Sequence, residues 1–212
     1  SDELDSWQVR IFEPTGILFK IIEGKGTPPF RVTWDGKSDS GELVQSGESY
    51  PVDFTVKDTV GRTGLAHDEI LVDILVMKEG DVYRIIIPSI HFAGYSASLF
   101  TLKDEKEILK NLEILRILAK KLDKFRDYAI TIEGHAAYVY WTDPNRRDKE
   151  QKEELLPLSK SRAETVKQAM MILGIAEKRM STIGLGGSRP VVPHTDLVNL
   201  WKNRRVEFIL KK

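Results

Sequence analysis

The sequence contains no cysteine among its 212 residues. This absence excludes disulfide bonds, thiolate nucleophiles and zinc sites built on cysteine. Long apolar runs are missing as well: none approaches the ~20 residues that a membrane-spanning helix needs, so we expect no membrane span in this chain. A signal peptide and a lipidation cysteine are also lacking. The opening letters, SDELDSW, are typical of the trimmed start of a larger protein, so these absences indicate little about location.

Neither sign of charge dominates. Lys plus Arg and Asp plus Glu both number 32, and the formal net charge is zero. A dedicated nucleic-acid-binding protein concentrates positive charge to attract phosphates, so we expect no nucleic-acid partner. We expect neither a metal nor a cofactor, because the histidines lack a ligand spacing such as His-x-x-x-His.

Short alternating runs separated by turn residues fill the first half of the chain. The runs are WQVRIFE, ILFKIIE, FRVTWDG, SYPVDFTVKD and HDEILVDILVM, with Gly, Pro and Asp between them. Val52, Phe54 and Val56 share one face at a period of two, which is the period of a β-strand. Strands of this length with turn residues at regular spacing predict an all-β sandwich.

The period changes after about residue 80. A strand-like run, DVYRIIIPSIHFA, precedes a stretch whose apolar residues recur every three or four positions, the pattern of an amphipathic helix. A strand (YAITIEG), a helix (LSKSRAETVKQAMMILGI) and two strands (MSTIGLG and NRRVEFILKK) follow. This order predicts an α/β domain, βαβαββ, with a mixed sheet and helices on one face. We place the boundary at residue 80, giving domains 1–80 and 81–212.

Four separated motifs resemble the OmpA-like C-terminal domain, a peptidoglycan-binding family, over roughly residues 82–212. They are Gly134-His135 at a strand end, Leu158-Ser159 with Arg162-Ala163 at a helix start, the Gly-rich stretch Gly184 to Pro190, and Asn203 to Glu207 at the last strand. The first half, with WDGKSDSGELVQSGESY and VKDTVGRTG, resembles the immunoglobulin-like repeat of FlgD-type proteins. The first resemblance implies periplasmic residence and a ligand in the peptidoglycan stem peptide.

The resemblance also implies how the ligand is bound. The family's ligand is a zwitterionic diamino acid, usually diaminopimelate, which needs an Asp for its ammonium and an Arg for its carboxylate. Arg162 takes the family's arginine position, and a planar guanidinium can bond both carboxylate oxygens. Arg204 resembles a second, pocket-side arginine. We predict that Ser159 caps the helix, so that free backbone N–H groups face the anion. A salt bridge to Glu133 is the structural alternative for Arg162.

The acidic side of this pocket is missing. The family's Thr-Asp pair aligns with Ala136-Ala137, its Asn with Leu155, and its later Glu with Gly187. Losing one partner of a buried charge pair costs roughly 2–5 kcal/mol, so the familiar mode of binding weakens unless the carboxylate is replaced. Asp143, or the acidic run Glu150-Glu153-Glu154, is the candidate replacement; a different, shorter diamino acid is the other explanation. The predicted peptidoglycan-binding residues are Arg162, Arg204, Asp143 and Ala137.

Aromatic residues alternate along the enlarged loop that follows the strand. Tyr138, Tyr140 and Trp141 can stack on sugar rings or anchor a partner protein, or they can fold the loop back onto the domain. We expect no catalysis, because no Gly-x-Ser-x-Gly elbow is present and Ser159 is better explained as a helix cap.

The sequence therefore predicts a non-catalytic cell-envelope module of two domains. It is expected in the periplasm, associated with the outer membrane through a portion outside this chain. Our leading hypothesis is that it binds the peptidoglycan stem peptide in a weak or altered mode. The alternative is a scaffold for another envelope protein that no longer binds peptidoglycan and uses the aromatic loop as its contact.

Overall fold

The computed structural model describes residues 3–87, 90, 92, 95–100, 102 and 104–212. The chain divides into two compact units, Ser1–Asp73 and Ile74–Lys212. The division falls before residue 80, where the sequence suggested it. The reason is that β5 (Met77–Glu79) forms an antiparallel hairpin with β6 (Val82–Ile87) and so joins the second sheet.

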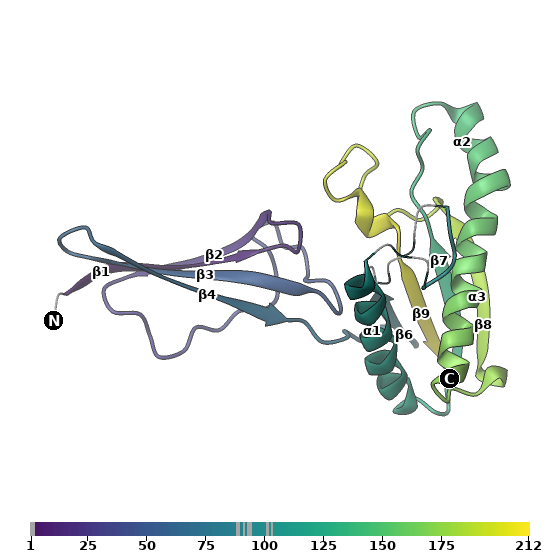
Figure 1. The fold of residues 1–212 in the computed structure, drawn as a ribbon, viewed down its shortest axis with the longest axis horizontal. Helices are drawn as coiled ribbons and strands as arrows, with labels where there is room; N and C mark the ends of the chain where they lie inside the picture. Colours follow the sequence, from purple (N-terminus) through teal and green to yellow (C-terminus); the bar gives the residue numbers. More distant parts are fainter. Residues whose placement is uncertain (1–2, 88–89, 91, 93–94, 101, 103) are drawn as a thin grey trace. The chain divides into compact units, whose positions relative to one another are not determined.

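The first unit is built on a four-stranded sheet in the order β2-β1-β3-β4 (Figure 1). All neighbouring pairs are antiparallel. The strands are β1 (Leu4–Phe12), β2 (Leu18–Lys25), β3 (Ser49–Asp58) and β4 (Thr63–Leu71). The all-β character expected for this half is confirmed.

The strand predicted in FRVTWDG is wrong. Within residues 26–48, all of them described, the only ladder contact is a single bridge between Lys37 and Leu43. Apolar side chains hold this irregular segment to the sheet: the Trp34 ring lies 6.1 Å from Phe19 and 6.3 Å from Tyr50, centroid to centroid. The Trp34 indole N–H also donates to the Lys37 carbonyl at 2.8 Å. Of the alternating apolar residues Phe30, Val32 and Trp34, the first two are exposed and only Trp34 has ring contacts with residues of the sheet.

The second unit is a five-stranded mixed sheet, in the order β5-β6-β9-β7-β8, with helices packed on it (Figure 1). β7 (Ala129–His135) and β8 (Met180–Gly186) are parallel, and the other neighbours are antiparallel. The remaining main elements are α1 (Glu105–Asp123), α3 (Leu156–Ile172) and β9 (Val206–Lys211). From β6 onward the predicted order βαβαββ is confirmed.

Strand alternation separates the two faces of this sheet. Ile130 and Ile132 of β7 are at most 1% exposed and lie in one apolar core with α1 and α3. Because successive side chains of a strand point to opposite faces, Glu133 lies on the other face. Glu207 of β9 pairs directly with Glu133 across the ladder and shares that face. None of the helices in the described ranges combines the length and apolarity that spanning a membrane requires.

The enlarged loop expected between His135 and Leu158 is largely helical. α2 (Pro144–Glu150) continues through a π-helical turn, η1 (Gln151–Leu155), directly into α3. Asp143 caps α2 by accepting from the Asn145 and Arg146 amides, and Pro144 suits the first turn because its position needs no donor. Pro157 also lacks an N–H and so cannot donate a helical hydrogen bond. The wider π-helical turn lies just before it, where the helix tolerates this missing donor.

Ser159 is not the helix cap that we predicted. Because the helix starts at Pro144, Ser159 lies inside α3 and is fully buried. Its hydroxyl donates to the Leu156 carbonyl at 3.1 Å and accepts from the Gly186 amide at 2.9 Å. The residue therefore joins α3 to the end of β8, and it does not leave first-turn N–H groups open to an anion.

Candidate functional site

The motifs that resembled a binding site meet at one edge of the second sheet, where β7 and β8 end and β9 begins. The Ala136 amide donates to the Gly186 carbonyl at 2.7 Å, and the His135 amide donates to the Arg205 carbonyl at 3.0 Å. α3 crosses this edge at close range, since a Cβ on Gly184 would lie 2.5 Å from the Lys160 backbone nitrogen. Glycine is thus required there for the helix to reach the strand ends.

Arg162 is buried at this edge, at 8% exposure. Its Nε donates to the Ser96 carbonyl at 3.0 Å, and its guanidinium carbon lies 5.0 Å from the centre of the Phe92 ring. Burial lowers the pKa of Arg162 to about 10, and the positive charge of Arg204 contributes to the same shift. The two predicted arginines are thus a cationic pair, in which the charge of Arg204 disfavours the charged form of Arg162.

Arg204 completes this cationic pair from the solvent side. It follows η3 (Leu200–Asn203), immediately before β9, and is exposed. The buried Asn203 beside it holds the loop by accepting from the Val191 and Val192 amides at 2.7 and 3.0 Å. Two guanidinium groups, one desolvated and one accessible, favour an anionic group such as a carboxylate.

The carboxylates proposed to replace the missing Asp have local structural roles. Asp143 caps α2, as described above. Glu150 is 4% exposed and accepts from the Val139 amide at 2.9 Å and the Tyr140 amide at 3.1 Å. Glu153 is exposed and pairs with Lys149 at 3.8 Å. Whether any of these meets a ligand ammonium stays a prediction.

The residues of the aromatic loop differ in their surroundings. Tyr138 meets the ring of His194 edge-on at 5.4 Å, and Trp141 stacks on the same ring at 6.4 Å and 21°. These two side chains fold the loop back onto the domain. Tyr140 is 37% exposed and carries the Arg146 guanidinium 3.6 Å above its ring centre.

Gln151 is a site residue that sequence reasoning missed. Its side-chain oxygen accepts from the Gly187 amide at 2.9 Å, and its side-chain nitrogen donates to the Leu185 carbonyl at 3.0 Å. The neighbouring Glu150 holds the aromatic loop in a similar way. Two consecutive residues of the inserted helix therefore fix both loops beside the arginines. Neither role is visible in sequence without knowing that residues 144–158 are helical.

Charged residues on the opposite face of the sheet form a separate network. Glu207 accepts from the Nε of Arg205 at 2.6 Å and from Arg84, while the His135 Nε2 lies 3.7 Å from Glu133 and 3.6 Å from Glu207. Glu133, His135 and Glu207 place three ligand atoms within 4.8 Å of one another, close enough to surround a metal ion. However, two arginines already bond Glu207, so a cation there would meet positive charge. We interpret the network as structural.

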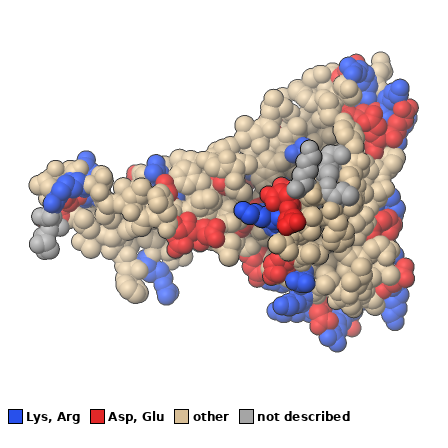
Figure 2. Space-filling view, in the orientation of Figure 1, with Lys and Arg blue, Asp and Glu red and all other residues tan. Residues whose placement is uncertain are grey.

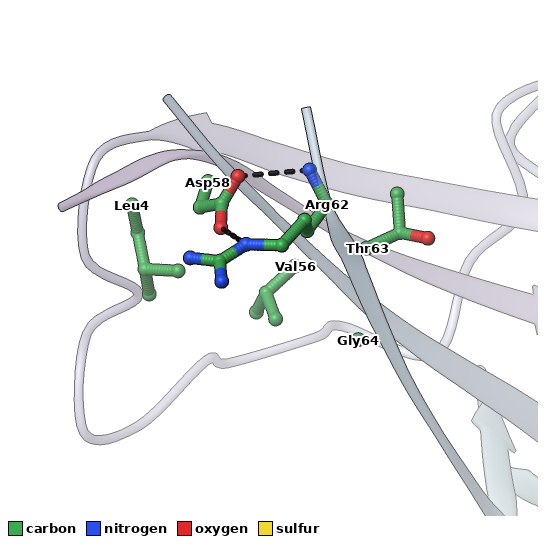
Figure 3. Close-up of a pocket in the computed structure, with 6 residues that line it drawn as sticks. All are labelled: Leu4, Val56, Asp58, Arg62, Thr63 and Gly64. Carbon is green, nitrogen blue, oxygen red and sulfur yellow. Dashed lines mark hydrogen bonds and ion pairs between the residues drawn. The ribbon is translucent and has the colours of Figure 1, made fainter. Parts of the chain in front are cut away.

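The first unit contains a pocket of about 330 Å³, whose charged residues bond to each other and to the backbone (Figure 3). Its only charged pair, among the lining residues, is Asp58 with Arg62, joined by a 2.6 Å bond from the Arg62 Nε. Asp58 also accepts from the Val60 and Arg62 amides, which closes the turn between β3 and β4. Burial alone would raise the pKa of Asp58, but these hydrogen bonds outweigh it and the pKa lies below 3.8. The carboxylate is thus already occupied.

The face drawn in Figure 2 carries positive and negative side chains in mixture. Among the residues coloured there, blue and red groups alternate instead of separating into one-sign surfaces. This distribution agrees with the zero formal net charge of the whole sequence. On this face, a broad positive field that could attract anions is therefore not seen among the coloured residues.

The fold defines a class of protein: a βαβαββ domain whose separated motifs meet at one edge of its mixed sheet. Residues 92–204, more than half of the chain, match the OmpA family, and the chain belongs to that family. The resemblance that we drew from four motifs is thereby confirmed for this unit. The immunoglobulin-like resemblance of the first unit stays a prediction.

Relatives with known names and structures support the same assignment. The peptidoglycan-binding protein ArfA of Mycobacterium tuberculosis is 31% identical over 98 residues, which are 46% of this chain and 27% of ArfA. The chain thus spans only about a quarter of that relative's length. A putative MotB-like protein from Desulfovibrio vulgaris is 25% identical with a TM-score of 0.51, covering 65% of this chain and 78% of that one. The periplasmic domain of Helicobacter pylori MotB, at 17% identity and a TM-score of 0.51 over 65% and 78%, shares the fold.

Proposed function

We propose that this chain is a non-catalytic module of the cell envelope that attaches to peptidoglycan through Arg162 and Arg204. One observation carries the proposal: a buried guanidinium, that of Arg162, and an exposed one, that of Arg204, both belong to the OmpA family motifs that meet at this sheet edge. A guanidinium can bond both oxygens of a carboxylate, and the stem peptide supplies carboxylates with this planar geometry. The printed name of ArfA, a peptidoglycan-binding protein, supports the same ligand.

The binding mode that we propose is altered with respect to the family. Ala137 stands where the family's Asp would meet the ligand ammonium, so carboxylate recognition dominates. Asp143 is our candidate for a substitute partner: the described bonds to its cap oxygen come from two amides, and a carboxylate has capacity for about four. Replacing Asp143 with Asn keeps a good helix cap and removes the charge. Unchanged affinity for stem peptide in Asp143→Asn would remove Asp143 from the site.

Location follows from the proposed ligand. Peptidoglycan lies in the periplasm of bacteria with an outer membrane, and we propose that this chain works there. A portion outside this chain would connect it to the outer membrane. The first unit, which we propose to be an immunoglobulin-like domain of the FlgD type, would serve as a spacer or a protein-interaction module.

Co-sedimentation with insoluble peptidoglycan tests the proposal. Wild-type protein should pellet with purified cell wall, Arg204→Ala should pellet less, and Arg162→Ala should stay in the supernatant. Arg116→Ala is the matched control, because Arg116 is exposed on α1 in the same unit. Arg204→Ala also guards against misfolding as an explanation, since an exposed side chain is removed without opening the core. Equal pelleting of all four proteins would contradict the proposal.

The scaffold function is the second candidate, and exposed apolar residues favour it. Val139 is 62% exposed and Tyr140 37% exposed on the same loop, a surface that a partner protein could cover. The same co-sedimentation separates the two functions. Wild-type protein that never pellets with cell wall, yet is captured by an envelope protein through this loop, would support the scaffold.

A further inference from the structure

The loop from Ala136 to Asp143 is held rigidly although its tip is exposed. Glu150, itself 4% exposed, accepts from two consecutive amides, those of Val139 and Tyr140. Asp143 closes the other end by capping α2. Burying a carboxylate is unfavourable unless it is well hydrogen-bonded. The hydrogen bonds of the buried Glu150 therefore both satisfy its carboxylate and fix the backbone of the exposed tip. A loop with no role in binding has no need of such support.

The ring of Tyr140 is fixed as well. The Arg146 guanidinium carbon lies 3.6 Å from the ring centre, a stacking distance, and Arg146 is one of the residues whose amide Asp143 caps. One face of the ring is thus covered by a planar cation while the residue keeps 37% of its surface exposed. A rigid, partly exposed aromatic ring provides contact area with little loss of side-chain entropy on binding.

The loop that carries this ring begins at the sheet edge where the OmpA-like motifs meet. Ala136 and Ala137 lead directly from the end of β7 into the loop, and Tyr138 lies against Gly187 of the Gly-rich loop. Gln151 fixes Gly187, and the adjacent Glu150 fixes Tyr140. The loop that carries Tyr140 is thus fixed against the Gly-rich loop through Tyr138 and the start of the inserted helix.

We propose that Tyr140 is a platform for a sugar ring of the peptidoglycan glycan strand, next to the stem-peptide site. This inference rests on the proposed function, because it adds a second contact to the same ligand. The apolar C–H face of a pyranose packs on an aromatic ring, and its hydroxyl groups need polar neighbours. Arg146, whose guanidinium stacks on the ring, supplies N–H donors of this kind. An aromatic ring with a polar neighbour suits a carbohydrate better than a purely apolar surface does.

Glycan strands freed of peptide by an amidase test the inference separately from the stem-peptide site. Wild-type protein should bind these strands weakly, Tyr140→Ala should bind about tenfold less, and Tyr140→Phe should bind nearly as well as wild type, because stacking needs only the ring. Arg116→Ala, which changes an exposed residue of α1 outside both proposed sites, should bind the peptide-free strands like wild type. Unchanged thermal unfolding of Tyr140→Ala would show that the loss is local.

The outcomes distinguish this inference from the proposed function. If peptide-free strands do not bind, or bind equally to Tyr140→Ala, the platform is wrong, although loss of wall binding in Arg162→Ala would still support the stem-peptide site. Binding of peptide-free strands through Tyr140, together with normal pelleting of Arg162→Ala with intact wall, would support the Tyr140 platform. The same result would contradict the proposed arginine site. Capture of an envelope protein that depends on Tyr140, without glycan binding, would overturn the inference in favour of a protein partner.

Discussion

Tyr138 lies in the space that a side chain at residue 187 would need: a Cβ on Gly187 would be 2.6 Å from the Cε2 of the tyrosine ring. The family's Glu is absent at 187, and an aromatic loop is present at 138. The glycine makes room for the ring. We therefore propose that the two departures are coupled, so that Tyr138 occupies space that a side chain at 187 would fill.

Restoring the family's Glu should destabilise this chain. Gly187→Glu forces its side chain against the Tyr138 ring, and overpacking of this kind costs about 1–3 kcal/mol. The double variant with Tyr138→Ala should recover much of that loss, because the clash is removed. Urea unfolding of the two single variants and the double variant gives the coupling. Strictly additive effects would show that the two residues do not compete for space.

Restoring the family's Asp should strengthen binding. Ala137 is half-buried in the site, and Ala137→Asp places a carboxylate where the family meets the ligand ammonium. We expect affinity for a stem peptide with a free diamino acid to rise at least about tenfold. The gain should vanish in the Arg162→Ala background, because the ligand is then not positioned. An equal gain with a peptide that lacks the free ammonium would contradict the reason given.

Neutralising Glu150 should loosen the aromatic loop. Glu150→Gln keeps the size of the side chain but weakens the charge-assisted bonds to the Val139 and Tyr140 amides, at a cost of about 1–3 kcal/mol. Amide hydrogen exchange of these two residues should accelerate, while that of β7 stays unchanged. Glu153→Gln is the control, since Glu153 is exposed on the same helical segment. Unchanged exchange in Glu150→Gln would show that other contacts hold the loop.

Acid should weaken the first unit partly through Asp58. Hydrogen bonds hold the pKa of Asp58 below its ordinary value of 3.8, so the unfolded chain takes up the proton more readily. The carboxylate therefore stabilises the fold above that ordinary value, and the contribution is lost as the pH falls through the folded pKa. Hydrogen exchange in β1 and β3 reports the stability of the first unit. The loss of amide protection between about pH 7 and pH 3 should be smaller for Asp58→Asn than for wild type. Asp68→Asn, exposed on β4, should behave like wild type.

Periodicity predicted the elements that depend on a simple burial pattern. The apolar spacing before residue 125 matches α1, and the alternation in YAITIEG matches β7. FRVTWDG also alternates, but its Trp34 packs onto a sheet from an irregular segment, a distinction that local pattern cannot make. Asp143-Pro144, a capping residue followed by a first-turn proline, is a sequence signal for the helix that begins at Pro144. We missed this signal because the family resemblance placed the helix start at Ser159.

The site was predictable only in part. Arg162 and Arg204 were identified from motif positions, and their role in binding stays a prediction. Gln151, Glu150 and the Tyr138–Gly187 contact depend on residues brought together by the inserted helix, so no local sequence signal shows them.

Titration of the protein with two soluble stem peptides tests carboxylate recognition most directly. The peptides are identical except that the diamino acid carries a free α-carboxylate in one and a carboxamide in the other. Calorimetry should give binding to the first peptide, with amidation or Arg162→Ala each reducing affinity by at least about tenfold. Equal affinity of wild-type protein for both peptides would contradict the account, because a guanidinium site must distinguish an anion from a neutral amide.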